Sequence, residues 1–335
     1  MTFHAIGDLA QSLSLRRHAA AAQSDVLRLG QELASGRVAA LSDHLGGSFA
    51  QLSDMESRLA RVAAQSAAGA EGSVRAEMMQ SALEHVETQL GALSGHALLA
   101  DHEGEGPALG AIAAEAGRAL ESMVGALNTR VAGQNIFAGD APDASPLAGA
   151  ASLMSAARAA VAGAGDAASV RAALDTFFDG AGSGFETLIY RGGTADASPH
   201  RLGNGEEVSL SIRADDARLR DALKQTVAAA LSADDTLALP GAERVALMRG
   251  AGAGMAGAIE AIVYLRADLG FAEARIDQSM SRNASEAAAL EIARSDLVSA
   301  DPFETATALE QAQLRLETIY TLTARTQRLN LVNFL

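Results

Sequence analysis

Apolar residues recur at helical spacing over long stretches at both ends of the chain. No proline interrupts the stretch from Ile6 to Leu33, and neither proline nor glycine occurs from Phe303 to Leu335. Side chains three and four residues apart lie on one face of an α-helix, so each stretch predicts a long amphipathic helix. An apolar face needs a partner, either the other terminal helix or another copy of the molecule. The residues that we predict to form this assembly interface are Ile6, Leu9, Leu13, Val26, Leu29, Leu33, Leu309, Leu316, Ile319, Tyr320, Leu329, Leu331, Phe334 and Leu335.

Further long helices are predicted between the two ends. From Phe49 to Leu99 apolar residues keep the spacing of a helix–helix seam, most regularly from Ala76 to Leu93. A helix of about 50 residues is on the order of 75 Å long, which is too long for a compact globule and indicates a rod. A third helix is expected to end at Gly133, and helix returns after Pro240.

The pattern changes between Asp140 and Pro240, where glycine, aspartate and short apolar runs dominate. Two runs, Phe185 to Arg191 and Glu207 to Arg213, are expected to be strands, since apolar and polar residues alternate in the second as in a half-buried strand. One helix, from about Asp216 to Leu231, is expected to pack on these strands. The segment is therefore predicted to be a small α+β insert.

The predicted fold class is mainly α: an elongated antiparallel helical rod built from both chain ends, with a small α+β domain inserted in the middle. Terminal assembly helices are assigned to residues 1–48 and 300–335. The rod is assigned to residues 49–137 and 240–299, and the insert to residues 138–239.

Composition limits the classes of function. The formal net charge of −15 argues against nucleic-acid binding, because no basic stripe is present to replace phosphate counterions. The absence of cysteine excludes disulfides, thiolate metal sites and thiol catalysis. Much of the apolar content is alanine, there is no tryptophan, and only 4% of residues are aromatic. Small side chains suit close helix–helix contact and give a thin seam.

We expect neither a membrane span nor a cleaved signal peptide. The first twenty residues are broken by Asp8, Arg16 and Arg17, and the sequence holds no uninterrupted stretch of about 18 apolar residues. Binding to a membrane surface is disfavoured because an acidic chain is repelled by anionic lipids. Any export is therefore expected to use another route.

The strongest enzymatic motif is Gly252-Ala-Gly254-Met-Ala-Gly257, which fits the dinucleotide pattern G-x-G-x-x-G. Those glycines approach a pyrophosphate only where the motif follows a strand. Here the preceding residues predict helix, so small residues at a tight helix crossing are the favoured interpretation. No catalytic constellation stands out, and we expect neither an enzyme nor a bound cofactor.

One acidic turn holds residue types that bind metals. His96, Asp101, His102, Glu103 and Glu105 lie close together in the sequence. A solvated turn between two helices explains them more simply than a metal site, so no metal is predicted.

Several segments resemble the flagellin family of bacterial flagellar proteins, and they occur in the family's order. The first is Leu29–Val38 (L-G-Q-E-L-A-S-G-R-V), similar to the family's L-S-S-G-x-R-I, followed by an acidic Ser42-Asp43. Near the other end, Leu265–Ile276 (L-R-A-D-L-G-F-A-E-A-R-I) is similar to L-R-x-x-L-G-x-x-x-N-R. Finally, Ala293–Phe303 (A-R-S-D-L-V-S-A-D-P-F) resembles A-R-S-R-I-E-D-A-D-Y.

Two further segments favour the members of this family that join the flagellar hook to the filament. Asn135–Pro146 (N-I-F-A-G-D-A-P-D-A-S-P) resembles their Y-L-F-S-G-x-x-T-D-x-x-P-F, with Asn135 in place of the aromatic residue. The segment Leu329–Leu335 (L-N-L-V-N-F-L) resembles their L-S-L-F-D-Y-L.

The resemblance implies a structural component of the bacterial flagellum, cytoplasmic before export by the flagellar type III route and then extracellular. It also implies neighbouring copies, another hook-associated protein on the hook side, flagellin on the filament side and an export chaperone on the C-terminal helix. Filament flagellin is the alternative, and a signalling coiled-coil protein or an unrecognised enzyme remains less favoured.

Overall fold

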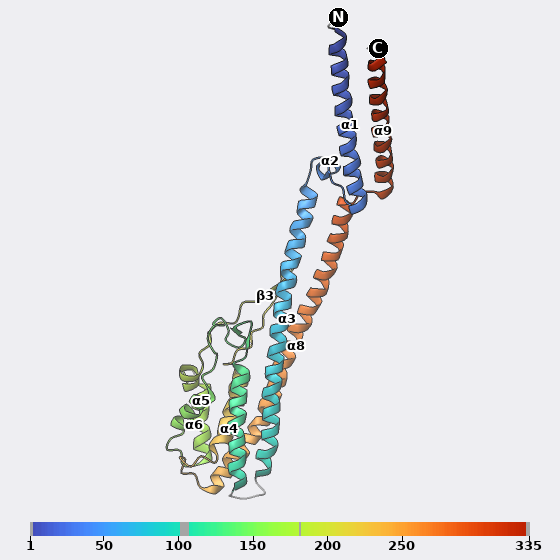
Figure 1. Ribbon diagram of the computed structural model, residues 1–335. Helices are drawn as coiled ribbons and strands as arrows, with labels where there is room; N and C mark the ends of the chain where they lie inside the picture. The colour runs from blue at the N-terminus through green and yellow to red at the C-terminus, as the bar shows by residue number, and fades with distance from the viewer. Residues whose placement is uncertain (1–2, 101–106, 181, 333–335) are drawn as a thin grey trace. The chain divides into compact units, whose positions relative to one another are not determined.

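The computed structural model in Figure 1 describes residues 3–100, 107–180 and 182–332, with side chains for residues 10–100, 108–180 and 182–325. Within it the chain forms two compact units. Unit 1 comprises residues 1–62 and 285–335, and unit 2 comprises residues 63–284. The long helices α3 (Ala50–Leu99) and α8 (Gly241–Val298) each contribute to both units.

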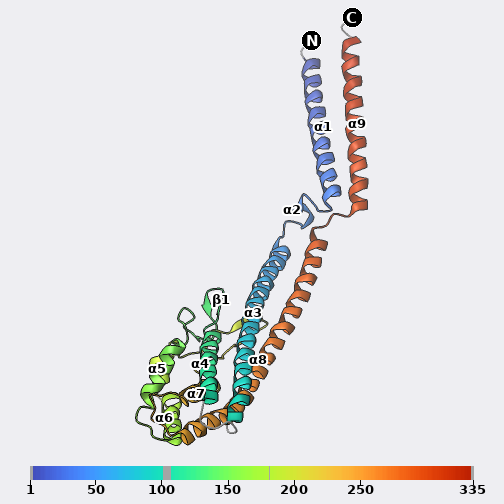
Figure 2. The ribbon, with the colours of Figure 1, turned by 60° about the horizontal axis from the view of Figure 1, so that its bottom comes forward.

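Unit 1 is built around two long terminal helices, α1 (Phe3–Ser35) and α9 (Pro302–Val332). They lie side by side and antiparallel (Figures 1 and 2). The expected break before the last helix is present: the Asp301 carboxylate accepts hydrogen bonds from the backbone N–H groups of Phe303, at 2.8 Å, and Glu304, at 3.0 Å. This satisfies donors that the first turn of a helix leaves free, so Asp301 starts α9. A short helix, α2 (Leu41–His44), was not predicted.

Unit 2 is organised on an antiparallel seam between α3 and α8. The Gln80 side chain donates to the carbonyl of Arg266 at 2.9 Å, and the Ser94 hydroxyl donates to the carbonyl of Gly252 at 3.0 Å. A Cβ atom placed at Gly252 would lie 2.8 Å from that of Ala97, so the glycine allows the close approach of the two helices. The fully buried residues of this seam include Ala76, Met79, Leu83, Val86, Leu90, Leu93, Ile262, Leu265 and Ile276.

The insert is more helical than predicted. It follows α4 (Pro107–Leu127), and α7 (Ala217–Leu231) packs on α4 and on α6, whereas packing on strands was expected. The helices α5 (Ala150–Ala160) and α6 (Ala167–Asp179) were not predicted. The Asp166 side chain caps α6 by accepting from the backbone N–H of Ser169 at 2.7 Å. The expected start of α7 at Asp216 is confirmed, since this residue caps the helix.

One predicted strand in the insert is wrong. Phe185–Ile189 forms a single π-helical turn, η2, in which the N–H of Tyr190 donates to the carbonyl of Phe185 at 2.8 Å. Phe185 and Ile189 are buried and four residues apart, which is helical spacing. A short apolar run of this kind fits a strand and a helix equally well by sequence.

The other predicted strand, Glu207–Arg213, forms only in part. The strand β4 (Glu206–Val208) pairs antiparallel with β3 (His200–Gly203), which was not predicted. Leu210 and Ile212 are buried, as the alternation in the sequence predicted. Among the described residues, however, no strand pairs with residues 209–213. Alternating apolar and polar residues indicate which side of an extended segment is buried. They do not indicate whether a neighbouring strand forms hydrogen bonds with it.

Helix α4 ends at Leu127, before the predicted end at Gly133. The Asn128 side chain pairs with the backbone of Leu147, accepting from its N–H at 2.9 Å and donating to its carbonyl at 3.1 Å. The chain then turns through β1 (Arg130–Val131) and β2 (Gln134–Asn135). Ala132 and Gly133, with φ of 49° and 85°, form the two-residue loop of this hairpin.

The segment after β2 is held by close packing and by one glycine. Ile136, Phe137 and Ala138 are buried. Gly139 has φ of 61°, and a Cβ atom there would collide with the carbonyl oxygen of Ala195. A side chain at this position is therefore excluded both by backbone strain and by lack of space.

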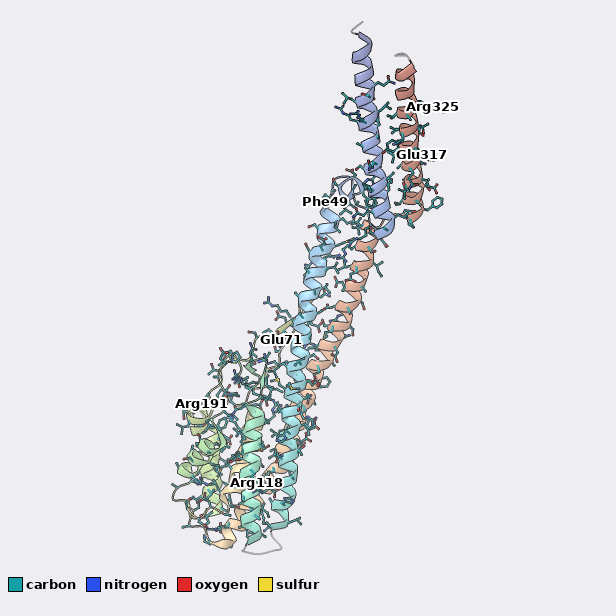
Figure 3. All side chains as sticks on the ribbon, in the orientation of Figure 1. Phe49, Glu71, Arg118, Arg191, Glu317 and Arg325 are labelled. Carbon is teal, nitrogen blue, oxygen red and sulfur yellow. The ribbon has the colours of Figure 1, made fainter. Side chains whose placement is uncertain are left out.

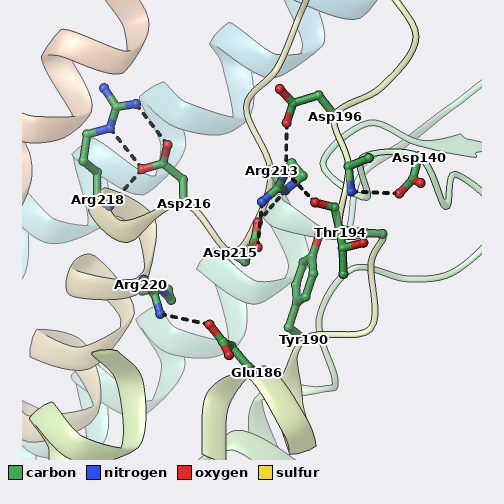
Figure 4. Close-up of polar contacts among 12 residues, drawn as sticks. Asp140, Glu186, Tyr190, Thr194, Asp196, Arg213, Asp215, Asp216, Arg218 and Arg220 are labelled. Carbon is green, nitrogen blue, oxygen red and sulfur yellow. Dashed lines mark hydrogen bonds and ion pairs between the residues drawn. The ribbon is translucent and has the colours of Figure 1, made fainter. Parts of the chain in front are cut away.

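Charged side chains fix the loops of the insert. As Figure 4 shows, the Arg213 guanidinium binds Asp215 through two nitrogens, at 2.8 and 3.0 Å, and also binds Asp196 at 2.9 Å. The Tyr190 hydroxyl donates to the carbonyl of Gly193 at 2.7 Å, and burial raises the pKa of Tyr190 to about 12. Lys224 of α7 contacts three carboxylates, those of Asp175, Asp179 and Asp221.

The prediction of a mainly helical chain, with its two ends paired and a small strand-containing insert, is confirmed. The three-part division into terminal helices, rod and insert stays a prediction, since the compact units divide the chain differently.

Candidate assembly surface

The pair formed by α1 and α9 has a narrow buried seam. Ala22 and Leu29 of α1 are buried, as are Ala312 and Ile319 of α9. Each of these pairs is seven residues apart, which is the repeat of a coiled coil. On α9 the repeat extends to Thr305, which is also buried. The seam is thin because half of these apolar side chains are alanine, which contributes little area.

The same two helices expose large apolar side chains away from the seam. Leu13 and Leu27 of α1 are 52% and 69% exposed, and Phe303 and Leu314 of α9 are 83% and 63% exposed. At about 100° per residue, Leu13 and Leu27 lie roughly on one face of α1, and Phe303 and Leu314 lie on one face of α9. Each face is on the far side of its helix from the seam residues. The two pairs therefore lie on opposite sides of the helix pair, and we call the four residues together the outer face.

Polar side chains lie beside the outer face on α9. Glu317 and Arg325, labelled in Figure 3, are both exposed. An apolar centre with a charged surround is the usual composition of a protein–protein interface.

The end of α1 is tied to the start of α9 by backbone hydrogen bonds. The N–H of Val38 donates to the carbonyl of Val298, and the N–H of Ala300 donates to the carbonyl of Gly36, both at 3.0 Å. Gly36, with φ of 67°, allows the reversal after α1. These residues belong to two of the flagellin-like segments. The flagellin-like sequence therefore lies at the corner that pairs the terminal helices.

A buried carboxylate supports this corner. Glu32 accepts a hydrogen bond from the backbone N–H of Ala39 at 2.9 Å and another from Arg28 at 3.1 Å. A buried charge is tolerated when it is paired and hydrogen-bonded, and both conditions hold here. Glu32 therefore fixes the turn that follows α1.

An open cavity of about 830 Å³ adjoins the corner. Its carboxylates are those of Asp25, Glu32, Asp43, Asp301 and Glu304. In residues 3–100, 107–180 and 182–332 no group of three or more histidine or acidic side chains is arranged to hold a metal ion. His96 binds Glu115 at 3.0 Å, whereas the segment Asp101–Glu105, considered above as part of a metal site, lies outside the described residues.

The predicted interface residues differ in how far they are buried. Leu29 and Ile319 are buried in the seam, and Val26, Leu309 and Leu316 are half-buried beside it, whereas Leu13, Leu33 and Tyr320 are exposed. Phe334 and Leu335 lie outside the described residues, and the side chains of Ile6, Leu9, Leu329 and Leu331 do so as well.

Three residues of the outer face were not predicted. Leu27, Phe303 and Leu314 are displaced from the main apolar stripe of their helices. A second, weaker apolar stripe on the opposite side of each helix was the available signal, with Leu13 and Leu27 fourteen residues apart. A further group of exposed apolar side chains, Val263, Tyr264 and Phe271, lies on α8 in unit 2.

The glycine-rich motif is helical, as expected. Gly252, Gly254 and Gly257 lie inside α8, and no strand precedes them among the neighbouring described residues, so the dinucleotide interpretation is excluded. One 18-residue window of α8 has a mean hydropathy of 1.2, so by length and composition alone this helix could cross a membrane. Ile262 and Leu265 of this helix are buried in the core of unit 2, which accounts for part of the apolar composition.

Replacing the buried carboxylate tests its role at the corner. Glu32→Ala is expected to lower the local free energy of opening of residues 36–40 by about 1–3 kcal/mol, because the N–H of Ala39 loses its acceptor. Hydrogen exchange of the Ala39 and Val38 amides measures this. Asp25→Ala, which removes the more exposed carboxylate near Arg28, is the matched control, with an expected change below about 0.5 kcal/mol. Equal protection in both variants would contradict the role of Glu32.

Comparisons with known proteins agree with this geometry. Residues 253–335 match the family model of the bacterial flagellin C-terminal helical region. The fold is similar to the crystal structure of Bacillus cereus FlgL, with a TM-score of 0.52 and 16% sequence identity over 72% of this chain and 100% of that one. A comparison with curated protein sequences found no match. The chain is therefore flagellin-like: its last part matches the flagellin C-terminal helical region, and its fold is similar to that of FlgL.

Proposed function

We propose that the protein is an axial structural component of the bacterial flagellum that joins the hook to the filament. Two similarities support this assignment: the flagellin-type helical region at residues 253–335, and the fold likeness to FlgL, a hook-associated protein 3 of the hook–filament junction. The junction-like segments Asn135–Pro146 and Leu329–Leu335 add to them. A type III export route would deliver the subunit to the growing structure.

The observation that carries the assembly mechanism is the outer face. Leu13, Leu27, Phe303 and Leu314 lie on the side of each helix away from the seam, so the α1–α9 pair does not bury them. Burying a leucine or phenylalanine side chain stabilises by roughly 1.5–3 kcal/mol. Neighbouring subunits that cover these residues would therefore stabilise the assembled state. Leu27, Phe303 and Leu314, together with Leu13, are the residues that we propose to contact neighbouring subunits.

We infer that pairing of the terminal helices and assembly are coupled. A seam of two alanines, one leucine and one isoleucine gives α1 and α9 little stability of their own, and forming long helices carries a large entropy loss. Contacts with neighbouring subunits would supply part of the buried apolar area that the seam lacks. Such contacts are expected to be head-to-tail, the type that builds helical stacks. The net charge of −15 would keep separate subunits apart by repulsion before assembly.

The proposed partners follow from this position in the flagellum. They are neighbouring copies of the protein, another hook-associated protein on the hook side and flagellin on the filament side. An export chaperone on the C-terminal helix would cover apolar residues such as Leu314 and Ile319 before secretion. We propose a cytoplasmic subunit before export and an extracellular one afterwards.

Filament flagellin is the second candidate, because the matching family model describes the flagellin C-terminal region itself. The two candidates differ in self-association. A filament subunit forms long polymers of itself under salting-out conditions, whereas a junction subunit is expected to remain largely monomeric. Sedimentation of the purified protein in ammonium sulfate separates them.

Deleting the gene tests the junction role in cells. We expect hooks without filaments by electron microscopy, with flagellin secreted into the medium, because filament subunits would then lack a surface on which to assemble. Restoring the full-length gene should restore filaments. Intact filaments in the deletion strain would contradict the proposal. If the deletion instead removes the only major subunit found outside the cell, the protein is favoured to be the filament flagellin.

Substituting the outer face tests the contact surface directly. The double variant Leu27→Ser with Leu314→Ser should lose most filament-supporting activity, since two leucine side chains no longer contribute apolar area. Its monomer should keep its helix content, because neither residue belongs to the seam. Leu188→Ser is the matched control, as Leu188 is a leucine in the insert that is 60% exposed. Filament growth equal to that of the unmodified protein would contradict assembly through the outer face.

A further inference from the structure

The β3–β4 hairpin crosses between two long helices of unit 2. On the side of α8, the carbonyl of Leu202 accepts hydrogen bonds from the hydroxyl of Ser279 at 3.0 Å and from the amide of Asn283 at 3.1 Å. Ser279 and Asn283 are both buried. Polar side chains inside a helix pair are tolerated only when they are hydrogen-bonded, so these two residues depend on the hairpin being docked.

On the side of α3, the hairpin packs on glycines. A Cβ atom at Gly72 would lie 3.2 Å from Cγ of the His200 ring, and one at Gly69 would lie 3.7 Å from a methyl group of Leu202. The histidine ring therefore occupies the space that the missing side chain of Gly72 leaves. Contacts to both α3 and α8 make the hairpin a brace between the two helices.

Among the residues that the structure describes, none forms a hydrogen bond with Nε2 of the His200 ring. Nε of Arg75 is also buried and has no hydrogen-bond partner within this part of the chain. Both residues line a cavity of about 340 Å³ that also includes Glu71, on α3, and Asp140. Figure 3 marks Glu71.

The charged groups around His200 come from several elements. Helix α3 supplies Arg75 and Glu71, and the loop after β2 supplies Asp140. Helix α8 presents apolar Ile276 at Gly72, beside the ring. Two arginines of α8, Arg275 and Arg282, are paired with Glu206 of the hairpin. A second pair on the hairpin, Arg201 with Glu207, is largely exposed.

Neutral imidazole fits this position better than imidazolium. Imidazolium carries an N–H at both ring nitrogens, so one of them would lie at the buried Nε2, where the described residues offer no acceptor, and the positive charge would lie near Arg75. Neutral imidazole can keep its single proton on Nδ1. Burial lowers the pKa of His200, Glu71 opposes this, and Arg75 lowers it further, with a net decrease. A group whose pKa is lowered by docking stabilises the docked state at pH values above the ordinary pKa of that group, which is about 6.5 for histidine. This contribution is lost as the pH falls.

We propose that the β3–β4 hairpin is an acid-sensitive brace between α3 and α8, held while His200 is neutral and released when His200 is protonated. Release would free the buried side chains of Ser279 and Asn283 from Leu202 and loosen the helix pair at that point. The inference rests on the packing of unit 2 alone and holds whether or not the protein is a flagellar junction subunit.

Hydrogen exchange of the full-length protein tests the brace. With rates corrected for the intrinsic effect of pH, the amides of Leu202 and Val208 should exchange several-fold faster at about pH 5 than at about pH 7.5. His200→Phe keeps a ring against Gly72 without a titrating group, so this variant should lose the acid response. His85→Asn, at an exposed histidine of α3 outside the brace, is the control and should keep it. An equal acid response in His200→Phe would overturn the proposal.

A second measurement does not depend on the folding of that variant. The NMR titration of the His200 ring in the unmodified protein should give a pKa below the ordinary histidine value. Arg75→Met removes the neighbouring positive charge, so it should raise the pKa of His200 and reduce the acid response of the hairpin. A His200 pKa at or above the ordinary value in the folded protein would overturn the proposal.

Discussion

The thin seam between α1 and α9 is the constraint on which the rest of the account depends. Ala22, Leu29, Ala312 and Ile319 allow close approach of the two helices but bury little apolar area. The seam uses only one side of each helix, and the outer face carries further large apolar residues. A protein that needed only to fold would gain little from that second set. The arrangement is more consistent with helices that are completed by neighbouring subunits.

Unit 2 holds its helices together in a different way. The α3–α8 pair uses a fully buried apolar seam, closer packing at Gly252 and polar cross-links such as Ser94 to the Gly252 carbonyl. The insert adds an aromatic cluster in which Phe178 stacks on Phe185 with ring centres 5.4 Å apart. These contacts are complete within one chain. The difference between the two units is therefore one of side-chain size and burial, not of helix length.

Periodicity predicted the long helices well because they obey a single repeat over many turns. It placed α3 and α8 within one residue of their observed starts and predicted the turn at Asp301, where a capping carboxylate precedes Pro302. The insert was less predictable because its elements are short. Phe185–Ile189 fits two spacings, and the partner of residues 209–213 depends on contacts far away in the sequence. The outer face was missed in part for a related reason: exposed leucines do not follow from a search for buried stripes.

Thiol labelling of the outer face tests the central claim most directly, because the chain has no cysteine of its own. A single Leu27→Cys or Leu314→Cys variant can be compared as purified monomer and in isolated flagella, with Leu188→Cys as the reference. Assembly through the outer face predicts rapid labelling of Leu27→Cys and Leu314→Cys in the monomer and strong protection in flagella, with the reference reactive in both. Equal labelling of the outer-face variants in the two states would contradict it.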